Sequence, residues 1–194
     1  VDTEHCSCGN QTAPLMLSSA GRYLWCDKGF TAVFSGGEIT ADSANGEIDF
    51  SDERGTLRTA YAAACAKHFP SNGVLPPEEF FTRPQFNTWI ELIYDQNQKD
   101  ILAYARKAVE EGFEPGILMI DDIWSNYYGK WDFDRAKFPD PKAMIDELHT
   151  LGFKVIMWIC PFVSPDSAEF REVSSKGGFI KDENGAIRLV SWWN

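Results

Sequence analysis

The order of apolar and polar positions divides the chain into two parts with different repeats. Before residue 81, short stretches rich in β-forming residues alternate with turn signals such as Gly36-Gly37 and Asn45-Gly46. This alternation predicts part of an antiparallel sheet. The expected strands cover residues 15–17, 23–26, 31–34, 38–40 and 47–50. An alanine-rich helix is expected to start at Thr56 and to end before Pro70.

After Pro84 the pattern alternates between strand and helix. Apolar residues spaced three and four apart predict helices over residues 99–111 and 141–151. The other expected elements are strands over 86–93, 117–120 and 153–159, a helix over 165–176, and a hairpin pairing 179–181 with 187–190 around Asn184-Gly185. The strand over 153–159 is almost continuously apolar, which predicts burial on both faces. This alternation is typical of βαβ units on a parallel sheet, either doubly wound or closed into a barrel.

Composition and charge narrow the classes of function. The 194 residues carry 18 basic and 29 acidic side chains, a net charge of -11, and 44% of them are hydrophobic. A negative chain repels polyphosphate and anionic membranes, so neither nucleic acid nor a membrane is an expected partner. No apolar run reaches the roughly 20 residues of a membrane span, so a soluble chain is expected. The compartment cannot be read from Val1 onwards, and a periplasmic or secreted location is compatible with the composition.

The cysteines and histidines do not form the pattern of a disulfide framework or of a metal site. Five cysteines are an odd number, which argues against a fully paired disulfide framework, and Cys160 is expected to be a buried thiol. His5, Cys6 and Cys8 crowd near the start, but no second Cys/His pair has matching metal-ligand spacing. Glycine motifs that bind phosphate are absent from the expected strand-to-helix turns. We therefore predict no metal and no cofactor.

Carboxylates and aromatic rings follow the expected strands instead. Asp121 and Asp122 come directly after the strand 117–120, and in α/β folds ligands bind at that edge. Trp124 opens an aromatic loop after them, and Trp89 and Trp158 fall at comparable positions. Taken singly, each tryptophan is most simply a core residue and the aspartates a turn cap and a solvated group. Together they predict a sugar pocket, in which carboxylates accept bonds from hydroxyl groups and indole faces stack on rings.

Several segments carry a resemblance to a known family. They are Asp121-Asp122-Ile123-Trp124, Trp131-Asp132-Phe133-Asp134, Lys137-Phe138-Pro139-Asp140-Pro141, Gly152-Phe153-Lys154-Val155 and Trp158-Ile159-Cys160-Pro161-Phe162-Val163. In order and spacing they resemble the early barrel of glycoside hydrolase family 31. The resemblance implies an α/β fold: the first three or so units of a (β/α)8 barrel over residues 83–194. Residues 1–82 would be the end of an antiparallel β-sandwich domain plus a helical linker.

The resemblance also implies an activity and roles for single residues. Members are retaining α-glycosidases acting on α-linked glucosides, xylosides or galactosides, without cofactors. Asp121 matches an aspartate that hydrogen-bonds to sugar hydroxyl groups, and Asp122 beside it is a second candidate for this role. Trp158 matches a position that lines the pocket. Trp89 resembles the aromatic at the end of the first barrel strand, and Trp193 the tryptophan that walls the pocket. The Trp192-Trp193-Asn194 ending is closer to a branch that includes α-galactosidases.

Two carboxyl groups about 5 Å apart are needed for retaining hydrolysis. Asp121 and Asp122 are adjacent and cannot flank a glycosidic bond from opposite faces, and Asp166 is expected at a helix N-terminus. The resemblance implies that the nucleophile and the acid/base lie after Asn194. A barrel takes about 250 residues, so we expect a segment of a longer enzyme, inactive alone, with the rest of the glycosidase as partner. The alternatives are a non-catalytic carbohydrate-binding protein and a metal-dependent phosphohydrolase built on the two aspartates.

Overall fold

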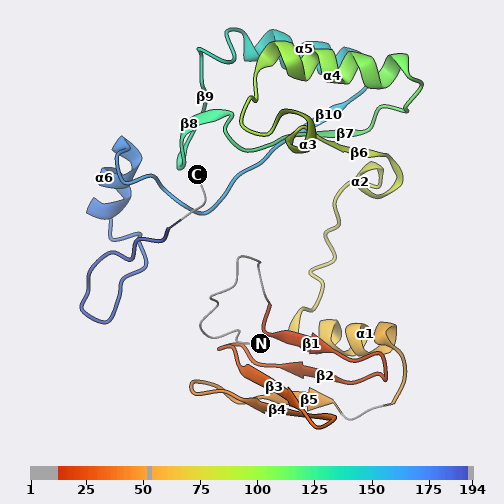
Figure 1. Cartoon of the computed structure of the whole chain (residues 1–194), viewed down its shortest axis with the longest axis vertical. Coiled ribbons are helices and arrows are strands. Elements are labelled where there is room, and N and C mark those ends of the chain that lie inside the picture. The colour runs from red at the N-terminus through yellow and green to blue at the C-terminus, as the bar shows by residue number, and fades with distance from the viewer. Residues whose placement is uncertain (1–12, 52–53, 192–194) are drawn as a thin grey trace. The chain divides into compact units, whose positions relative to one another are not determined.

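A computed structural model describes residues 13–51 and 54–191, and contacts between residues divide the chain into the units Val1–Val74 and Leu75–Asn194 (Figure 1). This division assigns α2 (Glu79–Thr82) to the second unit, whereas the domain boundary between residues 82 and 83 stays a prediction. Two features singled out in the sequence lie outside the described residues: the cluster His5, Cys6 and Cys8, and the ending Trp192-Trp193-Asn194.

Two small antiparallel sheets and a helix make up the described part of the first unit. One sheet has the order β1-β2-β5, and the other is a hairpin of β3 and β4. The elements are β1 (Leu15–Leu17), β2 (Tyr23–Trp25), β3 (Thr31–Ser35), β4 (Glu38–Asp42), β5 (Asp49–Ser51) and α1 (Leu57–His68). The predicted antiparallel pairing is confirmed. A small core of Cys26, Phe30 and Ala32 is fully enclosed.

Helix α1 begins where the sequence predicts it to begin. Thr56 Oγ1 accepts a hydrogen bond from the Thr59 amide at 3.3 Å, and Thr59 Oγ1 accepts one from the Thr56 amide at 2.9 Å. These two bonds form a reciprocal N-terminal cap, which satisfies amides that a helix start otherwise leaves without partners. Ala60 and Ala64 are fully buried, and the helix contacts β1 and β2. The small alanine side chains let the helix lie close to the sheet.

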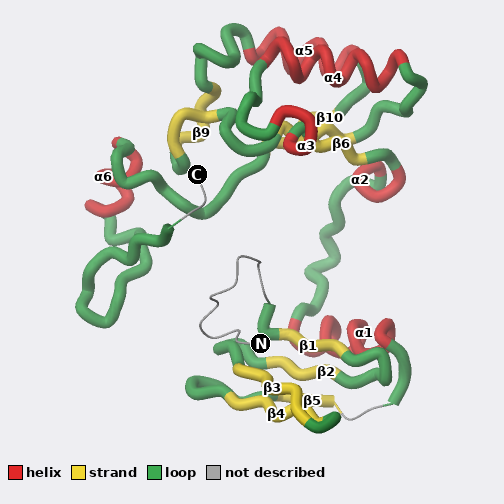
Figure 2. Tube along the Cα trace, in the orientation of Figure 1, coloured by secondary structure: helices red, strands yellow, loops and turns green. Residues whose placement is uncertain are grey.

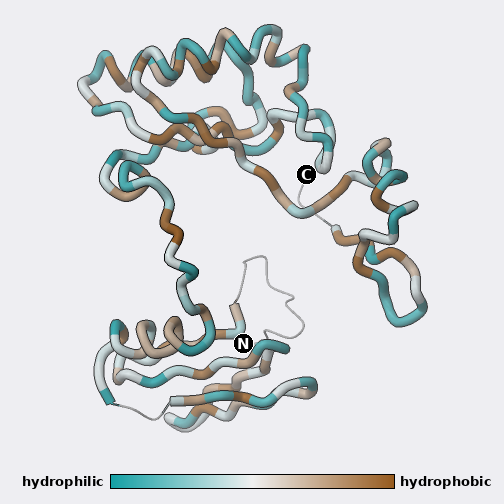
Figure 3. Tube along the Cα trace, turned by 180° about the vertical axis from the view of Figure 1, so that it is seen from behind, coloured by the Kyte–Doolittle hydropathy of each residue, from teal (hydrophilic) through white to brown (hydrophobic). Residues whose placement is uncertain are grey.

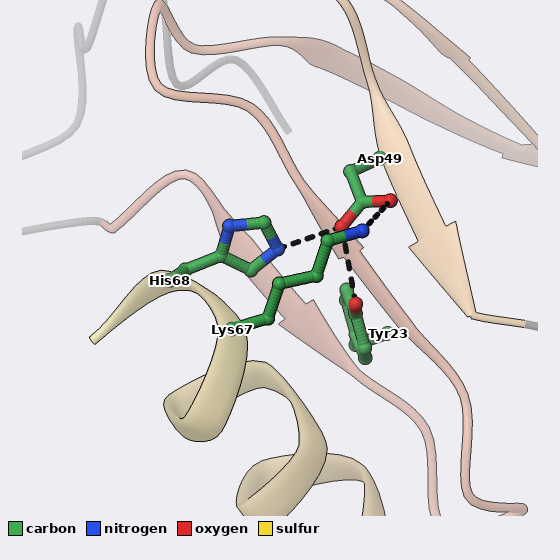
Figure 4. Close-up of polar contacts among 4 residues, drawn as sticks. All are labelled: Tyr23, Asp49, Lys67 and His68. Atoms are coloured by element: carbon green, nitrogen blue, oxygen red, sulfur yellow. Dashed lines mark hydrogen bonds and ion pairs between the residues drawn. The ribbon is translucent and has the colours of Figure 1, made fainter. Parts of the chain in front are cut away.

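A polar cluster joins the end of α1 to the sheet (Figure 4). The Asp49 carboxylate on β5 accepts hydrogen bonds from Lys67 Nζ at 2.8 Å and from the Tyr23 hydroxyl at 3.1 Å, and His68 Nε2 lies 2.7 Å from it. The His68 ring also stacks on Trp25 with centroids 5.2 Å apart. The Lys67 bond is the main cause that lowers the pKa of Asp49, with His68 and Tyr23 adding to it against the opposing effect of burial.

Replacing Asp49 with asparagine should destabilise the first unit at neutral pH by about 1 kcal/mol, because an amide binds the neighbouring cation less strongly. The native pKa of Asp49 lies below its ordinary value of 3.8. Its contribution is therefore complete above that value and is lost as the pH falls through the native pKa. Hydrogen exchange of the α1 amides should show the difference between Asp49→Asn and wild type at pH 7. An equal effect of the exposed control Asp42→Asn would contradict this account.

The second unit is built on a parallel sheet with strand order β10-β7-β6. Its strands are β6 (Gln85–Asn87), β7 (Ile117–Ile120) and β10 (Lys154–Met157). Gln85 and Lys154 both pair with Ile117, so the three strands start and end at nearly the same level. Helices α4 (Gln98–Glu110) and α5 (Pro141–Thr150) lie side by side over one face of this sheet (Figure 1). The alternation of strand and helix predicted for this region is confirmed.

The core of the second unit lies between this sheet and its two helices. Leu118 and Ile120 of β7 point into it, and the strands form an apolar stretch along the chain (Figure 3). The buried residues are Ile101, Leu102, Ala105, Leu118, Ile120, Trp124, Phe138, Met144, Leu148 and Phe153. Burial of apolar surface contributes about 25 cal/mol per Å² to the free energy of folding. The packing of these side chains therefore stabilises the position of the strand ends. None of the helices in the described part of the chain has the length and apolar composition that crossing a lipid bilayer requires.

Several expected elements are shorter than predicted. The strand expected over 86–93 ends at Asn87, because the Asn87 side-chain oxygen accepts the Trp89 amide at 2.7 Å and turns the chain into α3 (Trp89–Leu92). The full burial predicted for the strand 153–159 is wrong: Lys154 is exposed and the rest of β10 is half-buried, because among the described strands β10 pairs only with β7. Cys160, expected to be buried, is partly exposed.

Loops dominate the chain after β10 (Figure 2). Helix α6 (Ala168–Ser175) starts later than predicted, and its N-terminal cap is Ser167 rather than Asp166, because Ser167 Oγ accepts the Phe170 amide at 3.1 Å. The predicted hairpin is reduced to a turn around Gly185 and a single bridge between Lys181 and Ile187. An isolated pair of strands gains little from pairing alone. The remaining elements are β8 (Ser125–Tyr127) and β9 (Lys130–Phe133), which form a short hairpin after β7.

Candidate active site

Two adjacent carboxylates lie at the carboxyl end of the central strand β7. Asp121 is 8% exposed and Asp122 is 1% exposed. Burying an ionised carboxylate is costly unless hydrogen bonds replace the lost water. The contacts around these two residues therefore explain how the site is built.

The Asp121 carboxylate is held on both oxygens. Oδ1 accepts the Asp122 amide at 2.8 Å, and Oδ2 accepts the side-chain amide of Asn87 at 2.7 Å. Asn87 comes from the end of β6, which pairs with β7 in parallel register. The carboxyl ends of two neighbouring strands thus bring an amide donor to a carboxylate acceptor. Asp121 remains 8% exposed at this edge of the sheet.

The Asp122 carboxylate supports a sharp turn. Oδ1 accepts the amide of Ile123 at 2.7 Å, and Oδ2 accepts the hydroxyl of Tyr128 at 2.7 Å. Ile123 has φ of 67°, a left-handed conformation that costs a β-branched residue of the order of 1–3 kcal/mol. The hydrogen bond from its amide to Asp122 offsets part of this cost. Asp122 therefore fixes both the turn and the position of Tyr128.

A second set of buried polar groups lies behind Asp121. Thr88 and Gln96 are fully buried. Thr88 Oγ1 donates to Gln96 Oε1 at 2.6 Å and accepts the Asp121 amide at 3.1 Å. Gln96 Nε2 donates to the carbonyl of Ile93 at 3.0 Å, and Ile93 is itself strained, with φ of 48°. These bonds tie the end of β6 to the backbone of Asp121 beyond the last strand pair.

The tryptophans predicted to line the site fall in different environments. Trp124 is 4% exposed and packs in the core against Phe133, and its ring N–H donates to the carbonyl of Trp158 at 2.8 Å. Trp158 directly follows β10 and is half-buried, with its ring 5.9 Å from that of Tyr128. Trp124 thus supports the backbone that carries Trp158. The Trp158 ring lies beside Tyr128, whose hydroxyl donates to Asp122.

Trp89 lies on the other side of the site. It opens α3, is half-buried, and packs edge-to-face against Tyr94 at 5.4 Å. Its amide binds Asn87, so the ring follows directly from the strand end that contacts Asp121. Trp193, the sixth predicted site residue, lies outside the described residues. The structure therefore brings Asp121, Asp122, Trp89 and Trp158 to one edge of the sheet.

The electrostatic influence of the pair reaches Cys160, which follows β10. Burial is the main cause that raises the pKa of the Cys160 thiol, and the nearby negative charge of Asp122 raises it further. The thiol is therefore held protonated at neutral pH. This protonation makes it a poor nucleophile and a poor metal ligand.

The surroundings of the pair contain a large cavity but no metal cluster. A cavity of 1070 Å³ lies between the β8–β9 hairpin and the chain around α6, and Tyr128 and Phe162 line it. Asp121 and Asp122 are not among the described residues that line this cavity, whereas Tyr128, which donates to Asp122, is. Within the described ranges, no group of three or more His, Cys, Asp or Glu side chains could hold a metal ion.

Comparison with known sequences decides the family. A family model described as the glycosyl hydrolases family 31 TIM-barrel domain matches residues 78–194, more than half of the chain. The chain belongs to glycosyl hydrolase family 31. The matched part contains β6, β7 and β10 with every site residue named above.

Individual relatives agree with this family 31 membership. The chain is 32% identical over 129 residues to the myogenesis-regulating glycosidase of Mus musculus, covering 66% of this chain and 18% of that protein. It is 26% identical over 197 residues to alpha-xylosidase XylQ of Lactiplantibacillus pentosus, covering 93% and 24%. A family 31 dextranase of Flavobacterium johnsoniae has the same fold with a TM-score of 0.69 at 17% identity, over 94% and 22% of the two chains. The chain thus spans about a fifth of these relatives.

The fold of this family 31 chain is part of a glycosidase fold, and the three described parallel strands form no closed barrel. Sequence reasoning missed three polar residues of the site: Asn87, Thr88 and Gln96. Asn87 was missed because the strand was expected to continue to residue 93, so the sequence did not mark Asn87 as a strand end, where the rule that pointed to Asp121 applies. Gln96 carries no such signal, since it lies in the loop before α4.

Replacing Tyr128 with phenylalanine should remove one donor from the buried Asp122 carboxylate. A buried acceptor that loses a partner costs about 1–3 kcal/mol, so Tyr128→Phe should lower the free energy of unfolding of the second unit by that amount. Urea unfolding followed by tryptophan fluorescence measures the change. Tyr127→Phe is the matched control, because Tyr127 is in the same hairpin and 48% exposed. Equal stability of the two variants would show that the Tyr128 bond to Asp122 contributes nothing.

Proposed function

We propose that this family 31 chain belongs to a retaining α-glycosidase and supplies residues that hold the sugar. The observation that carries the proposal is the Asp121 carboxylate, which is ordered by two hydrogen bonds and still partly accessible at the carboxyl edge of the sheet. A fixed carboxylate with remaining lone pairs is a strong acceptor for sugar hydroxyl groups. Several relatives are described as glycosidases of α-linked xylose or galactose, which supports an α-linked substrate.

Each site residue then has a role in this proposal. Asp121 accepts hydrogen bonds from hydroxyl groups of the bound sugar, and Asp122 adds negative charge beside it and keeps Tyr128 in place. Trp89 and Trp158 are half-buried and offer ring faces to the apolar face of a sugar. Trp193 stays a predicted wall of the pocket. Trp124 acts through the core, by holding the Trp158 backbone.

The chemistry itself requires two further carboxyl groups. A retaining mechanism forms a covalent glycosyl-enzyme intermediate with one carboxylate and uses a second as acid and then base, about 5–5.5 Å apart. Asp121 and Asp122 are neighbours on one strand end, and both are occupied by structural hydrogen bonds. We therefore assign them to binding, and the nucleophile and the acid/base to carboxylates outside this chain. Neither step calls for a metal or a cofactor.

The protein that carries this chain at full length should hydrolyse at least one of the p-nitrophenyl α-D-galactoside, α-D-xyloside and α-D-glucoside. Proton NMR of the first-formed sugar should show the α-anomer, since double displacement retains configuration. Initial release of the β-anomer would contradict the retaining mechanism. Binding of the free sugars by calorimetry without turnover of any glycoside would favour the non-catalytic carbohydrate-binding alternative instead.

Replacing Asp121 with alanine in that protein should lower kcat/KM about 100-fold or more, because each lost charge-assisted hydrogen bond costs about 1.5–3 kcal/mol in the transition state. Steady-state kinetics on the best glycoside of the panel measures this effect. Asp132→Ala is the control, because Asp132 lies on β9 and is exposed. Turnover by Asp121→Ala equal to that of the control would remove Asp121 from the site.

A further inference from the structure

Both polar atoms of the Asn87 side-chain amide make hydrogen bonds. Its oxygen accepts the Trp89 amide at 2.7 Å, which identifies that atom as the acceptor and so turns the NH2 group toward Asp121. The nitrogen then donates to Asp121 Oδ2 at 2.7 Å and also lies 3.4 Å from the sulfur of Met119. The orientation of the amide is therefore set by the backbone of its own strand end.

The strand end that carries Asn87 is itself fixed by buried groups. The amide of Thr88 donates to the carbonyl of Met119 at 3.1 Å, and Thr88 Oγ1 accepts the amide of Asp121 at 3.1 Å. Gln96, fully buried, accepts the Thr88 hydroxyl and donates to the Ile93 carbonyl. Buried polar networks of this kind rigidify the backbone they connect, because breaking one bond leaves a buried group unsatisfied.

We propose that Asn87 is a positioning residue for Asp121, aiming its carboxylate at the sugar, and that Thr88 and Gln96 hold Asn87 in register for this task. The inference rests on the proposed function, in which Asp121 is the acceptor. An aspartate side chain has two rotatable bonds, and its oxygens exchange places freely unless donors fix them. The Asn87 donor on Oδ2 and the Asp122 amide on Oδ1 together leave one orientation of the carboxylate.

Replacing Asn87 with aspartate tests the contact with Asp121, because the two side chains have nearly the same shape and differ in one polar group. Asn87→Asp keeps the oxygen that accepts the Trp89 amide but sets a second oxygen against Asp121 Oδ2. Two carboxylates at that distance repel and compete for one proton. When they share a proton, the protonated group donates in place of the lost NH2. The neighbouring titratable groups are Asp122 and Tyr128, which are bonded to each other, Tyr94, which packs on Trp89, and Cys160, whose pKa is raised by burial and by Asp122.

The expected result is a deficit that depends on pH. At pH 7, Asn87→Asp should reduce kcat/KM about 100-fold on the best p-nitrophenyl glycoside, the size of loss that follows from a misplaced binding group. The ratio of variant to wild type should rise several-fold between pH 7 and pH 5, as the shared proton restores the donor. A residue that only stabilised the fold would lower the melting temperature and leave this ratio unchanged with pH.

Asn97→Asp is the matched control. Asn97 caps α4 through an oxygen that accepts the Asp100 amide, and its NH2 group donates to the Asp100 carboxylate at 2.8 Å. The control therefore creates the same pair of facing carboxylates at a helix start. It should change stability but not the pH dependence of kcat/KM relative to wild type. A pH-independent ratio for Asn87→Asp, or one that Asn97→Asp reproduces, would overturn the positioning role.

A second measurement separates this inference from the proposed function. If the wild-type protein turns over none of the three glycosides, the proposed activity fails, and crystal structures of wild type and Asn87→Ala still test the positioning role. The Asp121 carboxylate should leave its wild-type orientation in the variant. An Asp121 carboxylate that keeps this orientation in Asn87→Ala would overturn the inference, whatever the protein hydrolyses.

Discussion

The parallel register of β6, β7 and β10 determines which side chains can meet in the second unit. Gln85, Ile117 and Lys154 lie at one level, so β7 and β10 end together and β6 ends one residue earlier. The carboxyl ends then continue the same pairing with single hydrogen bonds: the Thr88 and Trp158 amides donate to Met119 and Ile120. Because these bonds extend the sheet by one residue on each side, Asn87, Asp121 and Trp158 follow neighbouring strand ends without any loop having to bring them together.

The chain is strained in two places near the carboxyl ends of these strands. In the described chain, Ile93 and Ile123 are the residues other than glycine with positive φ, and both lie directly beside the site. Each has a side chain next to it that compensates: Gln96 donates to the Ile93 carbonyl, and Asp122 accepts the Ile123 amide. Strained residues persist where the surrounding structure over-determines them, and they cluster at functional sites. Ile123 redirects the chain just after β7, and Ile93 does so at the end of α3, which follows β6.

Local pattern predicted the framework better than the roles of single residues. Helices α4 and α5 show apolar residues at helical spacing, and β7 is a continuous apolar run. Both patterns follow from burial in the core, so the sequence alone predicts them. Asn87 ends a strand that the apolar residues after it predict to continue to residue 93, because an amide side chain that bonds the backbone two residues on leaves no mark in hydropathy. Trp124 was predicted to belong to a sugar pocket, and its burial against Phe133 shows a contribution to the core that composition cannot distinguish from a pocket.

Adjacency in sequence gives the two aspartates unequal tasks. Successive residues at a strand end point in different directions, so only one carboxylate of such a pair can be aimed along the neighbouring strand ends. Asp121 takes that direction and meets Asn87, whereas Asp122 bonds to the turn and to Tyr128. An ionised carboxylate has about four acceptor sites, and Asp121 uses one on each oxygen for protein donors. The other acceptor sites belong to a group that is 8% exposed. The two protein donors thus restrict rotation of the Asp121 carboxylate while leaving some of its acceptor sites unused by these bonds.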